Sequence, residues 1–238
     1  MSTSSYLSDR INNLSESATL KMTKLGRELA AKGVNVISLS VGEPDFNTPD
    51  HVKDAAKKAL DENWTRYSPV PGYPELRQAI VNKLKTENNL DYDISQIVVS
   101  TGAKQSLSNV ILTLINPGDE VIIPTPYWVS YSEMVVLAEG KSVFINTEID
   151  NNFKITPAQL EAAITPKTKL FMFSSPNNPT GTVYSKDELA ALAKVFEKHP
   201  QVFIISDEIY EYINFGKGHE SIAQFPELRD RVIIINGL

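Results

Sequence analysis

Polar side chains that suit acid–base and ring-binding chemistry follow two strongly apolar segments of the chain. One segment leads into residues 174–181, which read SSPNNPTG, and the other, residues 202–206, leads into Asp207 and Tyr210. In an open α/β sheet, ligands bind beyond the carboxyl ends of the strands. We therefore expect the active site where these two segments end.

The most informative of these side chains are Asn178, Asp207 and Tyr210. Asn178 lies between Pro176 and Pro179, which we expect in trans and which stiffen the backbone around its amide. A carboxylate such as that of Asp207 suits a cationic ring nitrogen, whereas an amide and a phenol suit a phenolate oxygen. A cationic ring nitrogen and a phenolate oxygen are the polar groups on the ring of pyridoxal phosphate. Each residue alone is more often a turn, a cap or a packed aromatic, so the hypothesis depends on their combination.

Six motifs follow one another between residues 41 and 210. They read VGEPDF (41–46), YSP followed by Gly72 and ELR (67–77), TGAKQ (101–105), PYWVSY (126–131), PNNPTG (176–181) and SDEIY (206–210). In these motifs the sequence resembles the class I aminotransferases, which are fold-type I enzymes that use pyridoxal phosphate, and among them the bacterial aspartate aminotransferases. The resemblance covers the whole chain but only the first part of the family's length.

The resemblance implies a pyridoxal-phosphate site built from these motifs. It implies that Asp207 contacts the ring nitrogen and that Asn178 and Tyr210 hydrogen bond to the ring oxygen, while Trp128 stacks on the ring. The remaining implied cofactor ligands surround the phosphate group and are Gly102, Ala103, Lys104 and, from the neighbouring subunit, Tyr67. The implied substrate-binding residues are Gly42, Trp128, Asn178, Lys104 and Thr19. Of these, Lys104 and Thr19 would bind the distal carboxylate of the substrate.

The lysine that the family joins to the cofactor, the Schiff-base lysine, matches no residue of this sequence. The resemblance places it just past Leu238. We therefore expect no catalytic residue of this kind within the sequence. We also expect the family's later arginine and its C-terminal portion to follow residue 238.

The implied activity is transamination dependent on pyridoxal phosphate, with aspartate as the expected amino donor and 2-oxoglutarate as the expected acceptor. A non-catalytic or regulatory protein with the same fold and a lyase or synthase that uses the same cofactor remain alternatives. A dehydrogenase is disfavoured, because no Gly-x-Gly-x-x-Gly follows an expected strand. The resemblance also implies a homodimer with shared active sites. Whether prephenate is a further substrate is left open by the sequence.

Strand-like and helix-like segments alternate and predict an α/β fold whose three-layer sheet is mostly parallel. The expected strands are residues 36–39, 97–100, 120–123, 142–146, 170–174, 202–206, 209–215 and 231–235. The expected helices are residues 21–32, 50–60, 74–86, 105–115, 157–164 and 186–198. The resemblance assigns residues 1–45 to an N-terminal arm and part of a small domain. It assigns residues 46–238 to the cofactor-binding large domain, which is incomplete at its C-terminal end.

The amino-acid composition disfavours nucleic acid, metal ions and membranes as partners of this chain. The chain has 238 residues, of which 42% are hydrophobic, enough for one large or two small globular domains. The net charge of −6 and the scattering of the 23 Lys and Arg disfavour nucleic acid. With no cysteine and three histidines, a metal centre is not expected. We expect no membrane span, because no apolar run is long enough, and we expect a cytoplasmic protein.

Overall fold

The computed structural model describes residues 6–39, 42, 45–216 and 218–237. Two compact units can be distinguished. The first comprises the described residues of Met1–Ser15 and Pro74–Leu238, and the second comprises those of Glu16–Tyr73. The first unit contains the β-sheet, whereas the second contains the helices α2 and α3. The expected domain boundary at residue 45 stays a prediction.

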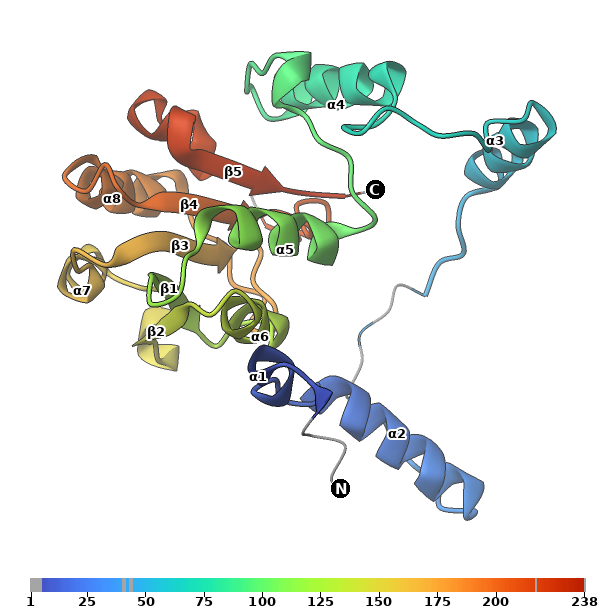
Figure 1. Cartoon of the computed structure of the whole chain (residues 1–238), viewed down its shortest axis with the longest axis horizontal. Coiled ribbons are helices and arrows are strands. Elements are labelled where there is room, and N and C mark those ends of the chain that lie inside the picture. The colour runs from blue at the N-terminus through green and yellow to red at the C-terminus, as the bar shows by residue number, and fades with distance from the viewer. Residues whose placement is uncertain (1–5, 40–41, 43–44, 217, 238) are drawn as a thin grey trace. The chain divides into compact units, whose positions relative to one another are not determined.

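The first unit is organised around a five-stranded sheet with the order β2-β1-β3-β4-β5, in which every pair of neighbours is parallel (Figure 1). The strands are β1 (Glu120–Thr125), β2 (Lys141–Asn146), β3 (Thr168–Ser174), β4 (Phe203–Asp207) and β5 (Val232–Ile235). This arrangement confirms the predicted α/β class and its parallel sheet. The register pairs Ser174 with Asp207 and Asp207 with Ile235. The three strands therefore end level with one another, at what we call the carboxyl edge.

The helices connect and cover these strands. The α-helices are α1 (Asp9–Asn12), α2 (Ala18–Ala31), α3 (Asp50–Asp61), α4 (Pro74–Glu87), α5 (Ala103–Leu114), α6 (Ser130–Leu137), α7 (Pro157–Ala163) and α8 (Lys186–Glu197). Short 3-10 helices are η2 (Ile94–Gln96), η3 (Ile149–Asn151), η4 (Ile222–Gln224) and η5 (Pro226–Arg231). None of the helices in the described part of the chain is long and apolar enough to cross a bilayer.

The sheet has an apolar core on each face, because alternate side chains of a strand point to opposite sides. In β4, Ile204 belongs to the core that includes residues of α4, α7 and α8, whereas Ile205 belongs to the core that includes residues of α5 and α6. Helix, sheet and helix therefore form the three expected layers. By the same alternation Asp207 lies on the α5–α6 face, and Ser206 and Glu208 lie on the other.

Three expected strands are not formed. Residues 36–39 and 97–100 have no regular structure, and they leave Ile37, Leu39 and Val98 largely exposed. Within the described residues neither segment has a neighbouring strand to pair with. Residues 209–215 form turns instead of a strand, because their backbone bonds close locally, from Glu211 N–H to the Glu208 carbonyl and from Ile213 N–H to the Tyr210 carbonyl.

The peptide bonds before Pro176 and Pro179 are cis. The expectation of trans bonds on either side of Asn178 is therefore wrong. A third cis bond precedes Pro126, in the segment between β1 and α6.

Candidate active site

Helix α5 begins at the carboxyl edge with a glycine in an unusual conformation. Gly102 is the N-cap and has a φ of 83°, a region that residues with a Cβ rarely adopt. A Cβ at this position would meet no atom within 4 Å, so the backbone conformation and not space calls for glycine. The amides of Ala103 and Lys104 open the first turn, where a helix provides no carbonyl partners and its dipole attracts anions.

A continuous line of side chains leads from this helix start to the end of β4. The ammonium group of Lys104 lies 4.8 Å from the centre of the Trp128 ring, and the Trp128 ring meets the Tyr131 ring edge-on at 5.7 Å. The Tyr131 hydroxyl then donates a hydrogen bond of 2.6 Å to Oδ2 of Asp207. Three motifs that are distant in sequence are thereby brought together. Lys104 covers one face of the Trp128 indole, so another ring could stack only on the opposite face.

Asp207 is a buried carboxylate, with only 4% of its surface exposed. Besides Tyr131, its described partner is the amide of Ile209, which donates to Oδ1 at 3.3 Å. Burial raises the pKa of Asp207, although both hydrogen bonds oppose this shift. The pKa of Tyr131 is raised well above its ordinary value by burial and by the charge of Asp207. The pair therefore consists of a phenol that keeps its proton and a carboxylate that has no cationic hydrogen-bond partner among the described residues.

Asn177 and Asn178, which are adjacent in sequence, have different environments. The side-chain oxygen of Asn177 accepts hydrogen bonds from the amide and hydroxyl of Thr180 at 3.1 and 2.9 Å, and thereby closes the turn. The side-chain nitrogen of Asn178 instead donates to the Tyr210 hydroxyl at 3.3 Å. Asn178 and Tyr210, predicted as a pair from sequence, are therefore neighbours. The turn itself is held by Asn177.

Backbone hydrogen bonds fix the end of β4 on both sides. The amide of Ser175 donates to the carbonyl of Asp207 at 3.1 Å, and the amide of Glu208 donates to the carbonyl of Ile235 at 2.8 Å. The chain around Asp207 is therefore tied to the ends of β3 and β5.

The second unit contains the other three expected site residues. Tyr67 is fully exposed and Gly42 is exposed. Thr19 lies in the first turn of α2, where its carbonyl accepts a hydrogen bond of 2.9 Å from the Thr23 hydroxyl. The residues that flank Gly42 in its motif, Val41, Glu43 and Pro44, lie outside the described residues. The roles of these three residues stay predictions.

The chain is similar to known proteins over nearly its whole length. The family model for aminotransferase class I and II matches residues 34–238. The chain belongs to this family. It is 51% identical, over 98% of its own length, to the aspartate/prephenate aminotransferase of Cereibacter sphaeroides. It is 49% identical, over the same share, to the enzyme of that name from Nitrosomonas europaea.

Solved structures of family members have the same fold. The aspartate aminotransferase from Rhizobium meliloti superposes with a TM-score of 0.94 at 42% identity, over 97% of this chain and 58% of its own. The aspartate aminotransferase from Thermus thermophilus with maleate superposes with a TM-score of 0.92 at 42% identity, over 97% of this chain and 60% of its own. The two curated relatives are each covered over 59% of their length. The chain thus spans well under two thirds of these family members.

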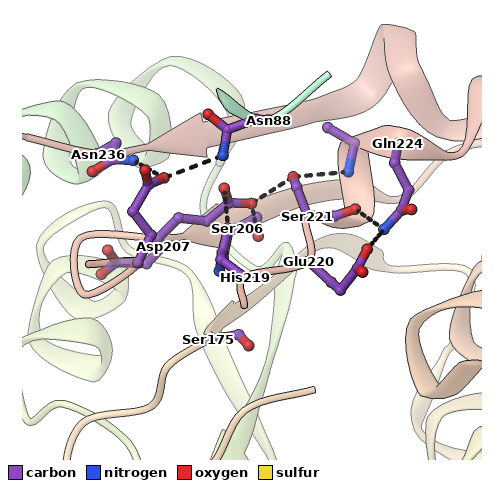
Figure 2. A network of polar contacts seen from close by, with 12 residues as sticks. Asn88, Ser175, Ser206, Asp207, His219, Glu220, Ser221, Gln224 and Asn236 are labelled. Atoms are coloured by element: carbon purple, nitrogen blue, oxygen red, sulfur yellow. Dashed lines mark hydrogen bonds and ion pairs between the residues drawn. The ribbon is translucent and has the colours of Figure 1, made fainter. Parts of the chain in front are cut away.

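Two features of this candidate site were not predicted from sequence. The first is Tyr131 as the hydrogen-bond partner of Asp207, a contact across 76 residues that no local pattern reveals. The second is a buried polar network that includes Glu208, Glu211 and His219, of which Figure 2 labels His219. A signal for this network was present in SDEIYE, where acidic residues recur immediately after an apolar strand.

Proposed function

We propose that the protein is an aminotransferase that uses pyridoxal phosphate to move an amino group from an amino acid to a 2-oxo acid. The observation that carries this proposal is the buried Asp207 at the carboxyl edge. Tyr210 lies in the turn that follows Asp207, and its hydroxyl contacts Asn178. Family membership and the names of the relatives support the same reaction class.

The donors and acceptors of this site fit the cofactor. The described partners of Asp207, Tyr131 and the Ile209 amide, are neutral, and burial raises the pKa of its carboxyl group. A protonated ring nitrogen would supply the positive charge that this carboxylate lacks. The Asn178 and Tyr210 side chains offer hydrogen bonds to the ring oxygen, and the first turn of α5 offers amides to a phosphate group.

When bound, pyridoxal phosphate supplies an electron sink for the bonding electrons of the substrate α-carbon. The protein's own residues set the conditions for this chemistry. Asp207 holds the proton on the ring nitrogen, and Tyr210 with Asn178 stabilises negative charge on the ring oxygen. Trp128, which is half-buried beside Tyr131, keeps water from one side of the site. The family lysine that we place after Leu238 stays a prediction.

We propose aspartate as the donor and 2-oxoglutarate as the acceptor. The relatives' names include aspartate and prephenate, and one structural neighbour was solved with maleate, which is a dicarboxylate. Prephenate is therefore a second acceptor to test. The experiment is to incubate the full-length protein, with the residues expected after Leu238, and the cofactor with aspartate and each acceptor, and to quantify the new amino acid and oxaloacetate. Ammonia released without a new amino acid would favour a lyase, and no turnover would favour a non-catalytic binder.

Lys104 is expected to select for the distal carboxylate of aspartate. Lys104→Ala should lower the preference for aspartate over alanine as donor by about tenfold, because a charged hydrogen bond typically contributes about 1.5 kcal/mol or more. Lys169→Ala is the matched control, since the Lys169 ammonium also lies over an aromatic ring, 5.2 Å from the centre of Phe203. An unchanged ratio of kcat/KM for the two donors in Lys104→Ala would remove the residue from this role.

We propose that the working unit is a homodimer with shared sites. The full exposure of Tyr67 and the exposed apolar residues of α2, among them Leu20 and Met22, support this proposal. If Tyr67 acts in the neighbouring subunit, coexpressed Tyr67→Ala and Asp207→Ala chains should form hybrids with one intact site. Activity should then reappear, although each variant alone is nearly inactive. An active monomer in sedimentation, or hybrids without activity, would contradict the shared site. A cytoplasmic location stays a prediction.

A further inference from the structure

A buried polar network surrounds Glu208, directly after Asp207 in the chain. Glu208 is only 1% exposed. Its Oε1 accepts hydrogen bonds from the hydroxyls of Ser206 at 2.9 Å and Ser221 at 2.6 Å, and its Oε2 lies 2.8 Å from Nε2 of His219. Figure 2 shows Ser206, Ser221 and His219 gathered at this point. The network lies on the face of the sheet opposite to Asp207, as the alternation along β4 requires.

A second carboxylate joins the network to other elements. Glu211 is 8% exposed and forms an ion pair with Lys83 of α4. Its Oε2 accepts hydrogen bonds from the side-chain amides of Asn236 at 2.7 Å and Asn88 at 3.4 Å, both labelled in Figure 2. Asn236 directly follows β5. The turn after Asp207 is thus tied to α4 and to the end of β5.

The geometry does not favour a metal centre. Ligand atoms of Glu208, Glu211 and His219 lie within 4.8 Å of one another, a spacing that a cation could bridge. However, all four carboxylate oxygens already have a hydrogen-bonding or charged partner. The ammonium group of Lys83 also provides positive charge beside Glu211. The carboxylate oxygens of the network are therefore satisfied by the protein itself, whereas Nδ1 of His219 is buried without a hydrogen-bond partner among the described residues.

The charges of the network balance when His219 is protonated. The charged groups of the described residues that shift its pKa are Glu208, Glu211 and Lys83. Burial alone would lower the pKa of His219, but the hydrogen bond to Glu208 and the negative charges of Glu208 and Glu211 outweigh burial and the opposing charge of Lys83, so the pKa is raised. With His219 charged, two positive and two negative groups share the buried site. Loss of the proton leaves a net negative charge there.

We propose that Glu208 and His219 are positioning residues, which fix the turn of residues 207–210 so that the Asp207 carboxylate and the Tyr210 hydroxyl face the cofactor site. This inference rests on the proposed function. Glu208 lies between the two residues in the chain, and its amide is hydrogen bonded to the Ile235 carbonyl at 2.8 Å. A displaced Glu208 side chain would move that amide, and with it the backbone on either side.

The test measures the backbone first, in the protein without cofactor. His219→Gln and Glu208→Gln should each increase hydrogen exchange at the amides of residues 208 and 209 by about tenfold, because each removes a hydrogen bond that involves a charged group. The control is His199→Gln, which breaks a contact of the same length, 2.8 Å from Nε2 to Glu161, away from the carboxyl edge. Should either variant fail to fold, Ser221→Ala removes one neutral donor to Glu208 and should show a smaller increase.

The second readout is the affinity for pyridoxal phosphate. It should fall in His219→Gln and Glu208→Gln and stay unchanged in His199→Gln. Protection at residues 208 and 209 in wild type should also fall as pH rises through the raised pKa of His219, above its ordinary 6.5, and this dependence should vanish in His219→Gln. Unchanged exchange would overturn the inference, as would increased exchange with unchanged cofactor affinity. Failure of the proposed function would be seen separately, as equal affinities for pyridoxal phosphate in wild-type protein and in Asp207→Ala.

Discussion

In the full-length protein, Asp207→Ala should slow transamination by about a hundred- to a thousandfold, because removal of a group that stabilises charge developed during the reaction typically has an effect of this size. Asp207→Asn should slow it to a similar extent, since an amide keeps the contact with Tyr131 but carries no charge. Tyr131→Phe is the matched control: it removes the hydrogen bond of 2.6 Å and leaves the carboxylate. Near-normal kcat in Asp207→Asn would show that packing, and not charge, is the contribution of Asp207.

Asp207→Asn, which should slow the reaction, should not destabilise the cofactor-free protein. Burial raises the pKa of Asp207 above its ordinary value of 3.8, so the folded protein holds this proton more tightly than the unfolded chain. Its contribution to the free energy of unfolding is therefore complete below pH 3.8 and is lost as pH rises through the raised pKa. Asp207→Asn should remove this dependence and leave the cofactor-free protein at least as stable at neutral pH.

The contact between Asn178 and Tyr210 should have the second-largest effect. Asn178→Ala and Tyr210→Phe should each lower kcat/KM by about tenfold, because each removes a hydrogen bond to a charged oxygen of the cofactor. The double variant should lose less than the product of the two effects, since the side chains are 3.3 Å apart and serve one atom. Tyr212→Phe is the control, because the Tyr212 hydroxyl bonds to Glu87 and its side chain is largely exposed. Strictly multiplicative losses would contradict a joint role.

The sheet could be predicted from sequence where strands are buried on both faces. Residues 170–174 and 202–206 are apolar except for the serine that ends each, and both form central strands within a residue or two of the expected bounds. Residues 97–100 are equally apolar, but the described part of the chain has no strand beside them, and Val98 stays 64% exposed. Local sequence shows a tendency to form a strand, whereas pairing depends on a partner elsewhere in the chain.

Helix α6 shows a signal that the sequence analysis did not use. Its buried residues Tyr131, Met134 and Val135 recur at helical spacing, but this helix is not among those expected from sequence. Asn178, and not Asn177, was the expected partner of Tyr210, and in the structure the Asn178 side chain donates to the Tyr210 hydroxyl. Tyr131, the partner of Asp207, could not be predicted from local spacing, because the contact depends on how α6 packs beside α5 over that face of the sheet.

The most direct test of the account is the protonation state of the bound cofactor. NMR of pyridoxal phosphate with an isotope-labelled ring nitrogen reports whether that nitrogen carries a proton. In wild-type protein the signal should be that of a pyridinium across the neutral pH range, and in Asp207→Asn it should move to that of a free pyridine. A signal that is the same in both proteins would contradict the central role of Asp207.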